Sequence, residues 1–261
     1  SLFMVASIGC SKPPNTLQNN THTEPYKIYE QGGKYFLGKD VPKDYKKAFS
    51  TSEYIIIAVK PYQVKEVLDE LVNSGADWSR SVFISICASV PTKYITNILH
   101  KDHPVIRIMP STPIAVGKGT AAISKNSFTD KKNFEYICRV FSSICEVAVI
   151  DEEVQNSIIS VNGSSPAYVY KLIKSMLDGA EEQGISPQSA LPIILRTIEG
   201  AVEMVRKSGE TPDSLIKKVS SPNGTTLAAL EVLDSNNFEQ NIKDAMKACT
   251  ERANQISIEL P

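Results

Sequence analysis

The feature that most limits the fold of this chain is a change of pattern near residue 150. Before that point, short apolar runs alternate with segments of helical periodicity; after it, amphipathic helical segments follow one another without a strand candidate. Such alternation predicts a parallel sheet with helices on both faces. We therefore expect an α/β fold followed by an all-α region, divided into a sheet domain over residues 1–150 and a helical domain over residues 151–261.

The apolar runs of the first half define the expected strands. Tyr54–Val59 (YIIIAV) is continuous and rich in β-branched residues, as in a strand that is buried on both faces. Thr16–Lys34 is polar, and we expect a loop with some helix there. The expected strands are Leu2–Ser7, Tyr54–Val59, Val82–Ile86, Val105–Ile108, Thr120–Ser124 and Val147–Ile150, and the expected helices are Lys43–Phe49, Gln63–Val72, Pro91–Leu99 and Lys131–Ser142.

Three helix starts in the second half share a hydroxyl residue followed by proline. They are Ser165-Pro166, Ser186-Pro187 and Thr211-Pro212. The hydroxyl side chain suits the N-cap position and proline suits the first helical position. The second of these helices carries a wide apolar stripe from Leu191 to Val205. A stripe of this width predicts burial against other helices, either within the subunit or in a partner.

Charge and cysteine content exclude several classes of protein. The 28 Lys and Arg residues nearly balance the 29 Asp and Glu residues, so no bulk field favours nucleic acid or a membrane surface. No apolar run reaches the length of a membrane span, and no signal peptide is recognisable. The five cysteines are scattered and lack metal-ligand spacing, which predicts a reducing compartment, here the cytoplasm, and no metal site. The three histidines have no catalytic setting, and we expect structural or surface positions for them.

The segment Ser220–Thr226 (SSPNGTT) lies between two helical segments and is small, polar and rich in hydroxyl groups. At the N-terminus of a helix, such a turn presents free backbone N–H groups and the positive end of the helix dipole, which suit a carboxylate or phosphate. Ser, Asn and Gly also dominate turns for purely local reasons. A capped turn without a ligand is therefore the competing interpretation.

Ligands of open parallel sheets bind beyond the C-terminal ends of the strands, where this sequence places small, hydroxylated or prolyl residues. Ser7, with Ser11 and Lys12 after it, can meet a ribose 2′-phosphate, and a solvated loop explains these residues equally well. Lys60 can reach a phosphate or a substrate carboxylate, with a solvated lysine as the alternative. No Gly-x-Gly-x-x-Gly follows a strand, so we expect that the first strand of a dinucleotide-binding fold and its glycine turn are missing from this sequence.

Four motifs together resemble one family. Ala58–Pro61 (AVKP) and Val105–Gly119 (VIRIMPSTPIAVGKG) are similar to its Ala-Val-Lys-Pro signature and its Val-x-Arg-x-Met-Pro-Asn-Thr-Pro segment. Gly163–Tyr168 (GSSPAY) and Ser221–Thr226 (SPNGTT) resemble Gly-Ser-Gly-Pro-Ala-Tyr and Ser-Pro-Gly-Gly-Thr-Thr. From about residue 2 to about residue 256, the chain resembles the pyrroline-5-carboxylate reductases, the last enzymes of proline synthesis.

The resemblance implies reduction of 1-pyrroline-5-carboxylate to L-proline with NADPH or NADH. It also implies a Rossmann-like domain followed by a helical domain that interlocks into homodimers and further into decamers. By motif position, the cofactor would be lined by Ala58, Lys60, Pro61 and Ala88, and Ser7 would meet the adenosine ribose or its 2′-phosphate.

For the substrate, the resemblance implies that Ser221, Thr225 and Thr226 hold the carboxylate and ring nitrogen, and that Glu152 lies near the proline ring. Hydride transfer to a protonated cyclic imine needs orientation more than a strong base. We hypothesise that the hydroxyl of Thr226 bonds the ring nitrogen, which makes Thr226 the expected catalytic residue.

Departures from the family pattern leave alternatives open. Ser165 and Asn223 stand where the family has glycine, and Ile159-Ser160 replaces a Thr-Gly pair. Asparagine tolerates the left-handed backbone that glycine would supply, so Asn223 is a mild change. The alternatives are a related imine or β-hydroxyacid reductase, which usually carries a catalytic lysine or histidine in its helical domain, and a catalytically impaired paralogue that acts as an oligomeric scaffold.

Overall fold

The structure is a computed structural model that describes residues 2–6, 27–31, 34–38, 49–50 and 52–261. Its contacts divide the chain into two compact units, which we call the sheet unit (Ser1–Ser164 with Cys249–Pro261) and the helical unit (Ser165–Ala248). The predicted division after residue 150 differs from these units. The reason is that the residues after 150 and the end of the last helix both hydrogen-bond to the sheet and its loops.

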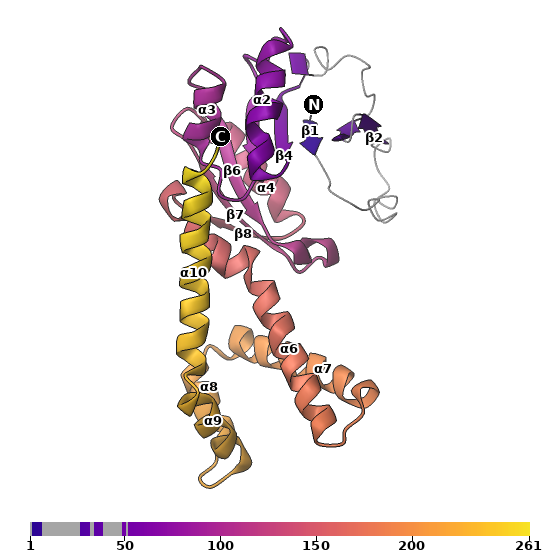
Figure 1. Ribbon diagram of the computed structural model, residues 1–261, viewed down its shortest axis with the longest axis vertical. Helices are drawn as coiled ribbons and strands as arrows, with labels where there is room; N and C mark the ends of the chain where they lie inside the picture. The colour runs from indigo at the N-terminus through magenta and orange to yellow at the C-terminus, as the bar shows by residue number, and fades with distance from the viewer. Residues whose placement is uncertain (1, 7–26, 32–33, 39–48, 51) are drawn as a thin grey trace. The chain divides into compact units, whose positions relative to one another are not determined.

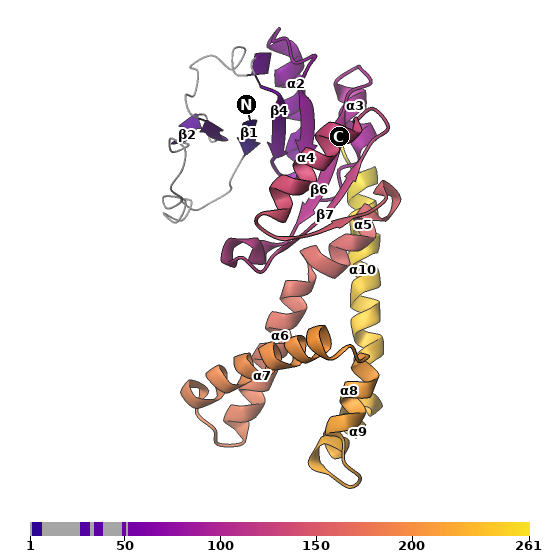
Figure 2. The ribbon, with the colours of Figure 1, turned by 180° about the vertical axis from the view of Figure 1, so that it is seen from behind.

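The sheet unit contains a mixed sheet of eight strands in the order β2-β3-β1-β4-β5-β6-β7-β8 (Figures 1 and 2). The expected parallel pairing is confirmed for β1, β4, β5 and β6 and for β7 with β8. It is wrong for β6 with β7, which are antiparallel because the connection between them is too short for a crossover helix. The strands are β1 (Leu2–Ala6), β2 (Lys27–Gln31), β3 (Lys34–Gly38), β4 (Tyr54–Ala58), β5 (Val82–Ser85), β6 (Val105–Pro110), β7 (Thr120–Lys125) and β8 (Glu146–Val149).

The prediction of a loop with some helix over Thr16–Lys34 is wrong where the structure describes this stretch, because residues 27–31 and 34 lie in strands β2 and β3. They pair with each other in antiparallel fashion, and β3 also pairs antiparallel with β1. The sequence signal was present, since two runs with apolar and aromatic residues flank Gly32-Gly33, and two glycines between such runs are typical of a hairpin. The helix expected over Lys43–Phe49 lies mostly outside the described residues.

The helices expected over Gln63–Val72, Pro91–Leu99 and Lys131–Ser142 are confirmed to within a few residues. The α-helices are α2 (Val64–Asn73), α3 (Thr92–Ile98), α4 (Lys131–Ser142), α5 (Gln155–Ile158), α6 (Ser165–Glu182), α7 (Pro187–Ser208), α8 (Pro212–Val219), α9 (Thr225–Ser235) and α10 (Phe238–Ile258). Short 3₁₀ turns are η2 (Pro61–Gln63), η3 (Thr112–Val116) and η4 (Glu152–Val154), and η5 (Ile159–Gly163) is a π-helix.

Two apolar layers hold helices against the two faces of the sheet. Successive strand residues point to opposite faces, so Ile55 and Ile57 pack with α2 and α3, whereas Ile84 and Ile106 pack with α4. Helix α2 lies in front of the sheet in Figure 1, and α4 lies in front of it in Figure 2. Side chains such as Phe83, which is fully buried, give this unit a complete core of its own. Helix cover on both faces leaves the loops at the strand ends as the place for a ligand.

The helical unit contains α6 to α9 and the first part of α10. Two of its three predicted N-caps are confirmed: the side chains of Ser186 and Thr211 accept hydrogen bonds from backbone N–H groups in the first turns of α7 and α8. The third is wrong, because Ser165 is already helical. The chain runs from α5 through the π-helix η5 into α6, where the N–H of Ser164 donates to the carbonyl of Ile159 at 2.8 Å, so that no free helix end needs a cap there.

Candidate active site

The expected cofactor residues lie where the neighbouring strands β4 and β5 end. Strand β5 is tied to β4 beyond its last residue, since the N–H of Ile86 donates to the carbonyl of Ile57 at 3.0 Å. The buried thiol of Cys87 donates to the same oxygen at 3.3 Å, and burial raises its pKa. Ala58 and Ala88 therefore follow adjacent, rigid strand ends, and both are half-buried. Two small side chains at adjacent strand ends leave room for a flat ring.

Lys60 and Pro61 form a fixed corner directly after β4. The N–H of Gln63 donates to the carbonyl of Lys60 at 2.9 Å, and the N–H of Lys60 donates to Oε1 of Gln63 at 3.2 Å. These bonds hold the backbone while the lysine side chain stays exposed. A positive charge at this corner suits a phosphate or a carboxylate. Ser7, the remaining residue of the expected cofactor set, lies outside the described residues.

Both oxygens of the Glu152 carboxylate are engaged by a neighbouring residue. Its two carboxylate oxygens accept hydrogen bonds from the backbone N–H and the hydroxyl of Thr92, both at 2.6 Å, at the first turn of α3. The guanidinium of Arg107 lies 3.9 Å from the same carboxylate. Burial lowers the pKa of Arg107 to about 10, against the attraction of Glu152, which raises it, so the group stays charged at neutral pH. The carboxylate is therefore held in place beside the loop that follows β5.

The expected substrate turn has the geometry of an open helix N-terminus. Gly224 is the N-cap of α9. Asn223 before it has a left-handed backbone with φ of 55°, which confirms the conformation expected where the family has glycine. A side chain at Gly224 would have its Cβ 3.0 Å from the carbonyl oxygen of Ser221 and 2.4 Å from its hydroxyl, so the turn has no room for one.

The first turn of α9 differs from those of α7 and α8. Ser186 and Thr211 cap the latter two with their own side chains, whereas α9 has no side-chain cap. Within the helical unit, which is described throughout, the hydroxyls of Thr225 and Thr226 make no hydrogen bond. The N-terminal end of α9 therefore presents unpaired backbone N–H groups and two hydroxyls, which together can bind a carboxylate.

The structure thus gathers the expected residues into two groups. Ala58, Lys60, Pro61, Ala88 and Glu152 belong to the sheet unit, and Ser221, Thr225 and Thr226 belong to the helical unit.

His103 confirms the structural role expected for the histidines that the structure describes. Its ring is buried at 1% exposure, stacks edge-on against Trp78 and Phe83, and bonds the carbonyl of Ser81 through Nε2 at 2.7 Å. Elsewhere His100 is exposed, and His22 lies outside the described residues. Among the residues with described placement, no group of three His, Cys, Asp or Glu side chains is arranged to hold a metal ion.

A polar network around Arg107 escaped the sequence interpretation. The buried guanidinium donates from Nη2 to Oδ1 of Asn156 at 2.6 Å, and Asn156 donates to Asn254 and Ser257 on α10. The available signal was an arginine inside the apolar run of β6, because an arginine within a buried strand needs partners.

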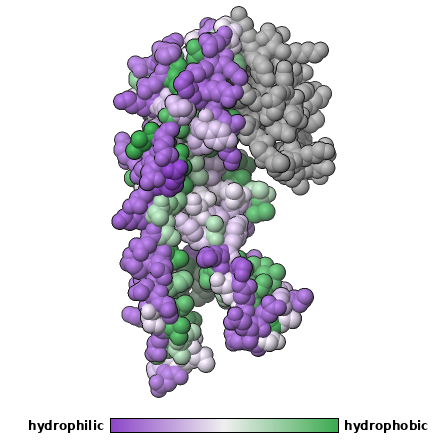
Figure 3. Space-filling view, in the orientation of Figure 1, coloured by the Kyte–Doolittle hydropathy of each residue, from purple (hydrophilic) through white to green (hydrophobic). Residues whose placement is uncertain are grey.

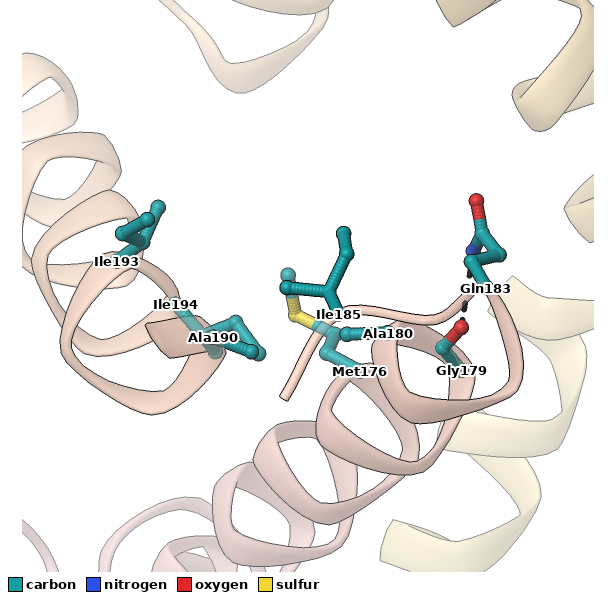
Figure 4. A pocket seen from close by; sticks show the side chains of 8 residues that line it. All are labelled: Met176, Gly179, Ala180, Gln183, Ile185, Ala190, Ile193 and Ile194. Atoms are coloured by element: carbon teal, nitrogen blue, oxygen red, sulfur yellow. Dashed lines mark hydrogen bonds between the residues drawn. The ribbon is translucent and has the colours of Figure 1, made fainter. Parts of the chain in front are cut away.

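The helical unit exposes much of its apolar surface. Figure 3 shows apolar side chains on the outside of this unit. Ile193 is 66% exposed. A groove of about 350 Å³ between α6 and α7 is shown in Figure 4, where Met176, Ile185 and Ile193 project into the same space. Apolar faces of this kind mark interaction surfaces. Across the described part of the chain, no helix combines the length and apolar character that crossing a membrane requires.

Comparisons with known proteins agree with both halves of the chain. Residues 152–256 match the dimerisation domain of pyrroline-5-carboxylate reductases, and residues 9–89 match a domain described as NADP oxidoreductase, coenzyme F420-dependent. The pyrroline-5-carboxylate reductase of Synechocystis sp. is 32% identical over 216 residues, covering 83% of this chain and 79% of the relative. The enzyme of the same name from Escherichia coli is 32% identical over 207 residues, covering 79% and 76%.

A solved structure supports the same conclusion. The crystal structure of Plasmodium falciparum pyrroline carboxylate reductase with NADP bound is similar with a TM-score of 0.77 and 26% identity, covering 84% of this chain and 86% of that one. The expected fold class, a Rossmann-like sheet domain followed by a helical dimerisation domain, is confirmed. This chain belongs to the pyrroline-5-carboxylate reductase family.

Proposed function

We propose that this protein reduces 1-pyrroline-5-carboxylate to L-proline with NADPH or NADH, the last step of proline synthesis. The observation that carries the proposal is the uncapped first turn of α9, with Thr225 and Thr226 at its tip, in a chain that is 32% identical to named pyrroline-5-carboxylate reductases. The match of residues 9–89 to an NADP oxidoreductase domain, and the NADP bound to the Plasmodium relative, favour NADPH.

The residues at the strand ends fit a dinucleotide. Ala58 and Ala88, both half-buried on adjacent strand ends, would flank the nicotinamide ring, because their small side chains leave its plane unobstructed. Lys60 would pair with an anionic group of the cofactor or substrate, held at its corner by Pro61 and Gln63. When bound, the reduced nicotinamide supplies a hydride. By its position in the family pattern, we assign Ser7 to the adenosine ribose of the cofactor or to its 2′-phosphate.

The substrate is a cyclic imine with one carboxylate, and the turn before α9 matches both groups. The N–H groups at the start of α9 and the hydroxyls of Ser221 and Thr225 would bind the carboxylate, aided by the positive end of the helix dipole. The hydroxyl of Thr226 would accept a hydrogen bond from the protonated ring nitrogen. Carboxylate and nitrogen held together fix the face of the imine carbon that accepts the hydride, which is the orientation this reaction needs.

Glu152 contributes through position rather than through an open carboxylate. Its oxygens are engaged by Thr92, and Arg107 neutralises part of its charge. On the family motif alone we assign Glu152 to the substrate, whose iminium form a negative charge would favour, and within the sheet unit it fixes the loop after β5. The pyrrolidine nitrogen keeps its proton after hydride addition, so no general base is required.

We further propose that the protein acts as a homodimer, assembled into larger rings up to a decamer, in the cytoplasm. The dimerisation domain over residues 152–256 and the exposed apolar side chains of α6 and α7 support self-association. The four cysteines that lie among the described residues are free, which suits a reducing compartment. Light scattering of the purified protein gives its mass and decides between dimer and decamer.

The test of the activity is the oxidation of NADPH by the purified full chain in the presence of 1-pyrroline-5-carboxylate. We expect oxidation that depends on the imine and yields proline in equal amount. A β-hydroxyacid with NADP serves as the control for the related reductases of the same architecture. Absence of imine-dependent oxidation, under conditions where the protein is folded and binds NADPH, would contradict the proposed function and favour a scaffold role.

A further inference from the structure

The last turns of α10 bond directly to the loop that carries Ala88. The hydroxyl of Ser257 lies 2.6 Å from the carbonyl oxygen of Ser89 and donates to it, and lies 3.1 Å from the carbonyl of Ala253 in its own helix. Helix α10 is otherwise remote in sequence, since the contact joins residues 168 positions apart. The end of the chain therefore holds the segment that follows β5.

Ser257 is itself positioned by a chain of side chains. Asn156 of α5 donates one amide hydrogen to Oγ of Ser257 at 3.0 Å and the other to Oδ1 of Asn254 at 2.9 Å. Its own Oδ1 accepts from the buried guanidinium of Arg107 at 2.6 Å. The Asn156 amide is thus used at both hydrogens and at its oxygen. This arrangement directs the single hydroxyl hydrogen of Ser257 away from Asn156 and towards Ser89.

The other end of the same loop is held by the same arginine. Arg107 lies against Glu152, whose carboxylate binds the N–H and hydroxyl of Thr92. The loop between β5 and α3 is therefore clamped on both sides, at Ser89 by α10 and at Thr92 by Glu152. Both clamps meet at one buried cation on β6.

The clamped residue is under backbone strain. Ser89 has φ of 63°, a left-handed conformation that non-glycine residues adopt only when their surroundings enforce it, and the residue is 2% exposed. The hydrogen bond from Ser257 is one of the contacts that enforce it. Because Ala88 directly precedes Ser89 in the chain, relaxation of Ser89 moves the peptide that flanks the proposed nicotinamide site.

We propose that Ser257 is a positioning residue for the nicotinamide cofactor, acting through Ser89 on Ala88. This inference rests on the proposed function, in that Ala88 lines the cofactor site. It makes the last turns of α10, which belong to the sheet unit, a determinant of cofactor affinity. Its consequence is a split effect, in which loss of the hydroxyl weakens NADPH binding and leaves the chemical step and imine binding in place.

The experiment replaces Ser257 in the full chain and measures steady-state kinetics together with NADPH binding by calorimetry in the absence of imine. For Ser257→Ala we expect the KM and the Kd for NADPH to rise about three- to tenfold, as for loss of one hydrogen bond. We expect kcat and the KM for 1-pyrroline-5-carboxylate to stay within about twofold of wild type, because the lost hydrogen bond acts on cofactor binding alone. Ser257→Thr should restore NADPH affinity and Ser257→Val should not, because these two side chains share a shape and differ in the hydroxyl.

The matched control is Ser143→Ala at the end of α4, whose hydroxyl donates at 2.6 Å to the carbonyl of Val140 in its own helix. It should leave NADPH affinity unchanged. Wild-type NADPH affinity in Ser257→Ala, or equal losses in the Thr and Val variants, would overturn the inference. A wild-type chain that binds NADPH without reducing the imine removes only the proposed reaction, and the calorimetry still decides the role of Ser257. A wild-type chain that binds no NADPH overturns both.

Discussion

The two units of this chain use apolar residues in opposite ways. In the sheet unit, Ile55 is 1% exposed and Phe83 is fully buried, so strands and helices close over a finished core. In the helical unit, Ile193 is 66% exposed and Val232 is 61% exposed on helices that are just as well formed. The difference shows that a regular amphipathic helix does not imply a core within one subunit. The sheet unit closes over its own core, whereas the helical unit, which matches a dimerisation domain, leaves large apolar side chains exposed.

This contrast separates the proposed cofactor site from the proposed substrate site. The proposed cofactor residues stand on strand ends whose positions a complete core fixes, whereas the proposed substrate turn lies on helices that leave large apolar side chains exposed. We therefore expect the stability of the sheet unit to be independent of protein concentration and the integrity of the helical unit to depend on it.

The largest effect is expected in the sheet core. Phe83→Ala removes a fully buried ring that packs between the strands, Trp78 and His103. Such a deletion costs about 3–5 kcal/mol of unfolding free energy. Chemical denaturation followed by the fluorescence of Trp78, the single tryptophan of the chain, measures it. Phe128→Ala, at a ring that is 47% exposed, is the control and should cost far less. Equal costs for the two variants would show that the sheet core is not closed.

The next effect concerns the helical unit. Ile193→Asp places a charge in the groove between α6 and α7 at a side chain that is exposed in the single chain, so the subunit itself should fold. Because burying an isoleucine contributes about 1.5–3 kcal/mol, we expect the dimer dissociation constant to rise by about ten- to a hundredfold. Sedimentation equilibrium measures the change.

The control for the groove is Arg196→Ala on the same helix, at a side chain that is 84% exposed and paired only with Glu199 at the surface. This variant should dimerise like wild type, since surface ion pairs contribute little. If Ile193→Asp dimerises as tightly as Arg196→Ala, the groove is not part of the interface and the contrast between the units loses its explanation.

The smallest effect is a pH dependence confined to the sheet unit, because all three histidines of the chain precede the helical unit. Burial lowers the pKa of His103 below its ordinary value of 6.5. The unfolded chain then binds a proton before the folded one does, so unfolding becomes easier as pH falls below about 6.5. Above that pH, His103 is neutral in both states and contributes no slope.

Two variants isolate this contribution. His103→Gln removes the titrating ring, so its loss of stability between neutral pH and pH about 5 should be smaller than that of wild type. His100→Gln, at the exposed neighbour, should follow the wild-type curve. Identical pH profiles for wild type and His103→Gln would mean that the buried ring does not titrate in this range.

Much of this structure could be predicted from local pattern. The β-branched run Tyr54–Val59 and the caps at Ser186 and Thr211 specify their elements because burial and capping act within a few residues. Ser165 was misassigned because capping depends on whether a helix end is free, and here the preceding turn continues into α6. Pattern could not give the pairing of β6 with β7, since strand direction depends on how the connection runs.

The candidate site also combines local features that could be predicted from sequence with long-range contacts that could not. Gly224 and Asn223 could be interpreted from sequence, because a left-handed residue before an N-cap is a local requirement. The role of Glu152 at Thr92 and the bond from Ser257 to Ser89 join residues 60 and 168 positions apart, and nothing in either neighbourhood indicates the partner. Such long-range polar contacts are set by the packing of whole elements.

The central claim is that the turn before α9 holds the imine substrate, and Thr226→Val tests it most directly. Loss of one hydrogen bond to the charged ring nitrogen costs about 1–3 kcal/mol, so kcat/KM for 1-pyrroline-5-carboxylate should fall by about five- to 150-fold. NADPH affinity should not change, and Thr96→Val, whose hydroxyl bonds only the carbonyl of Lys93 in its own helix, should behave as wild type. A Thr226→Val enzyme that keeps wild-type kcat/KM would contradict this account of the site.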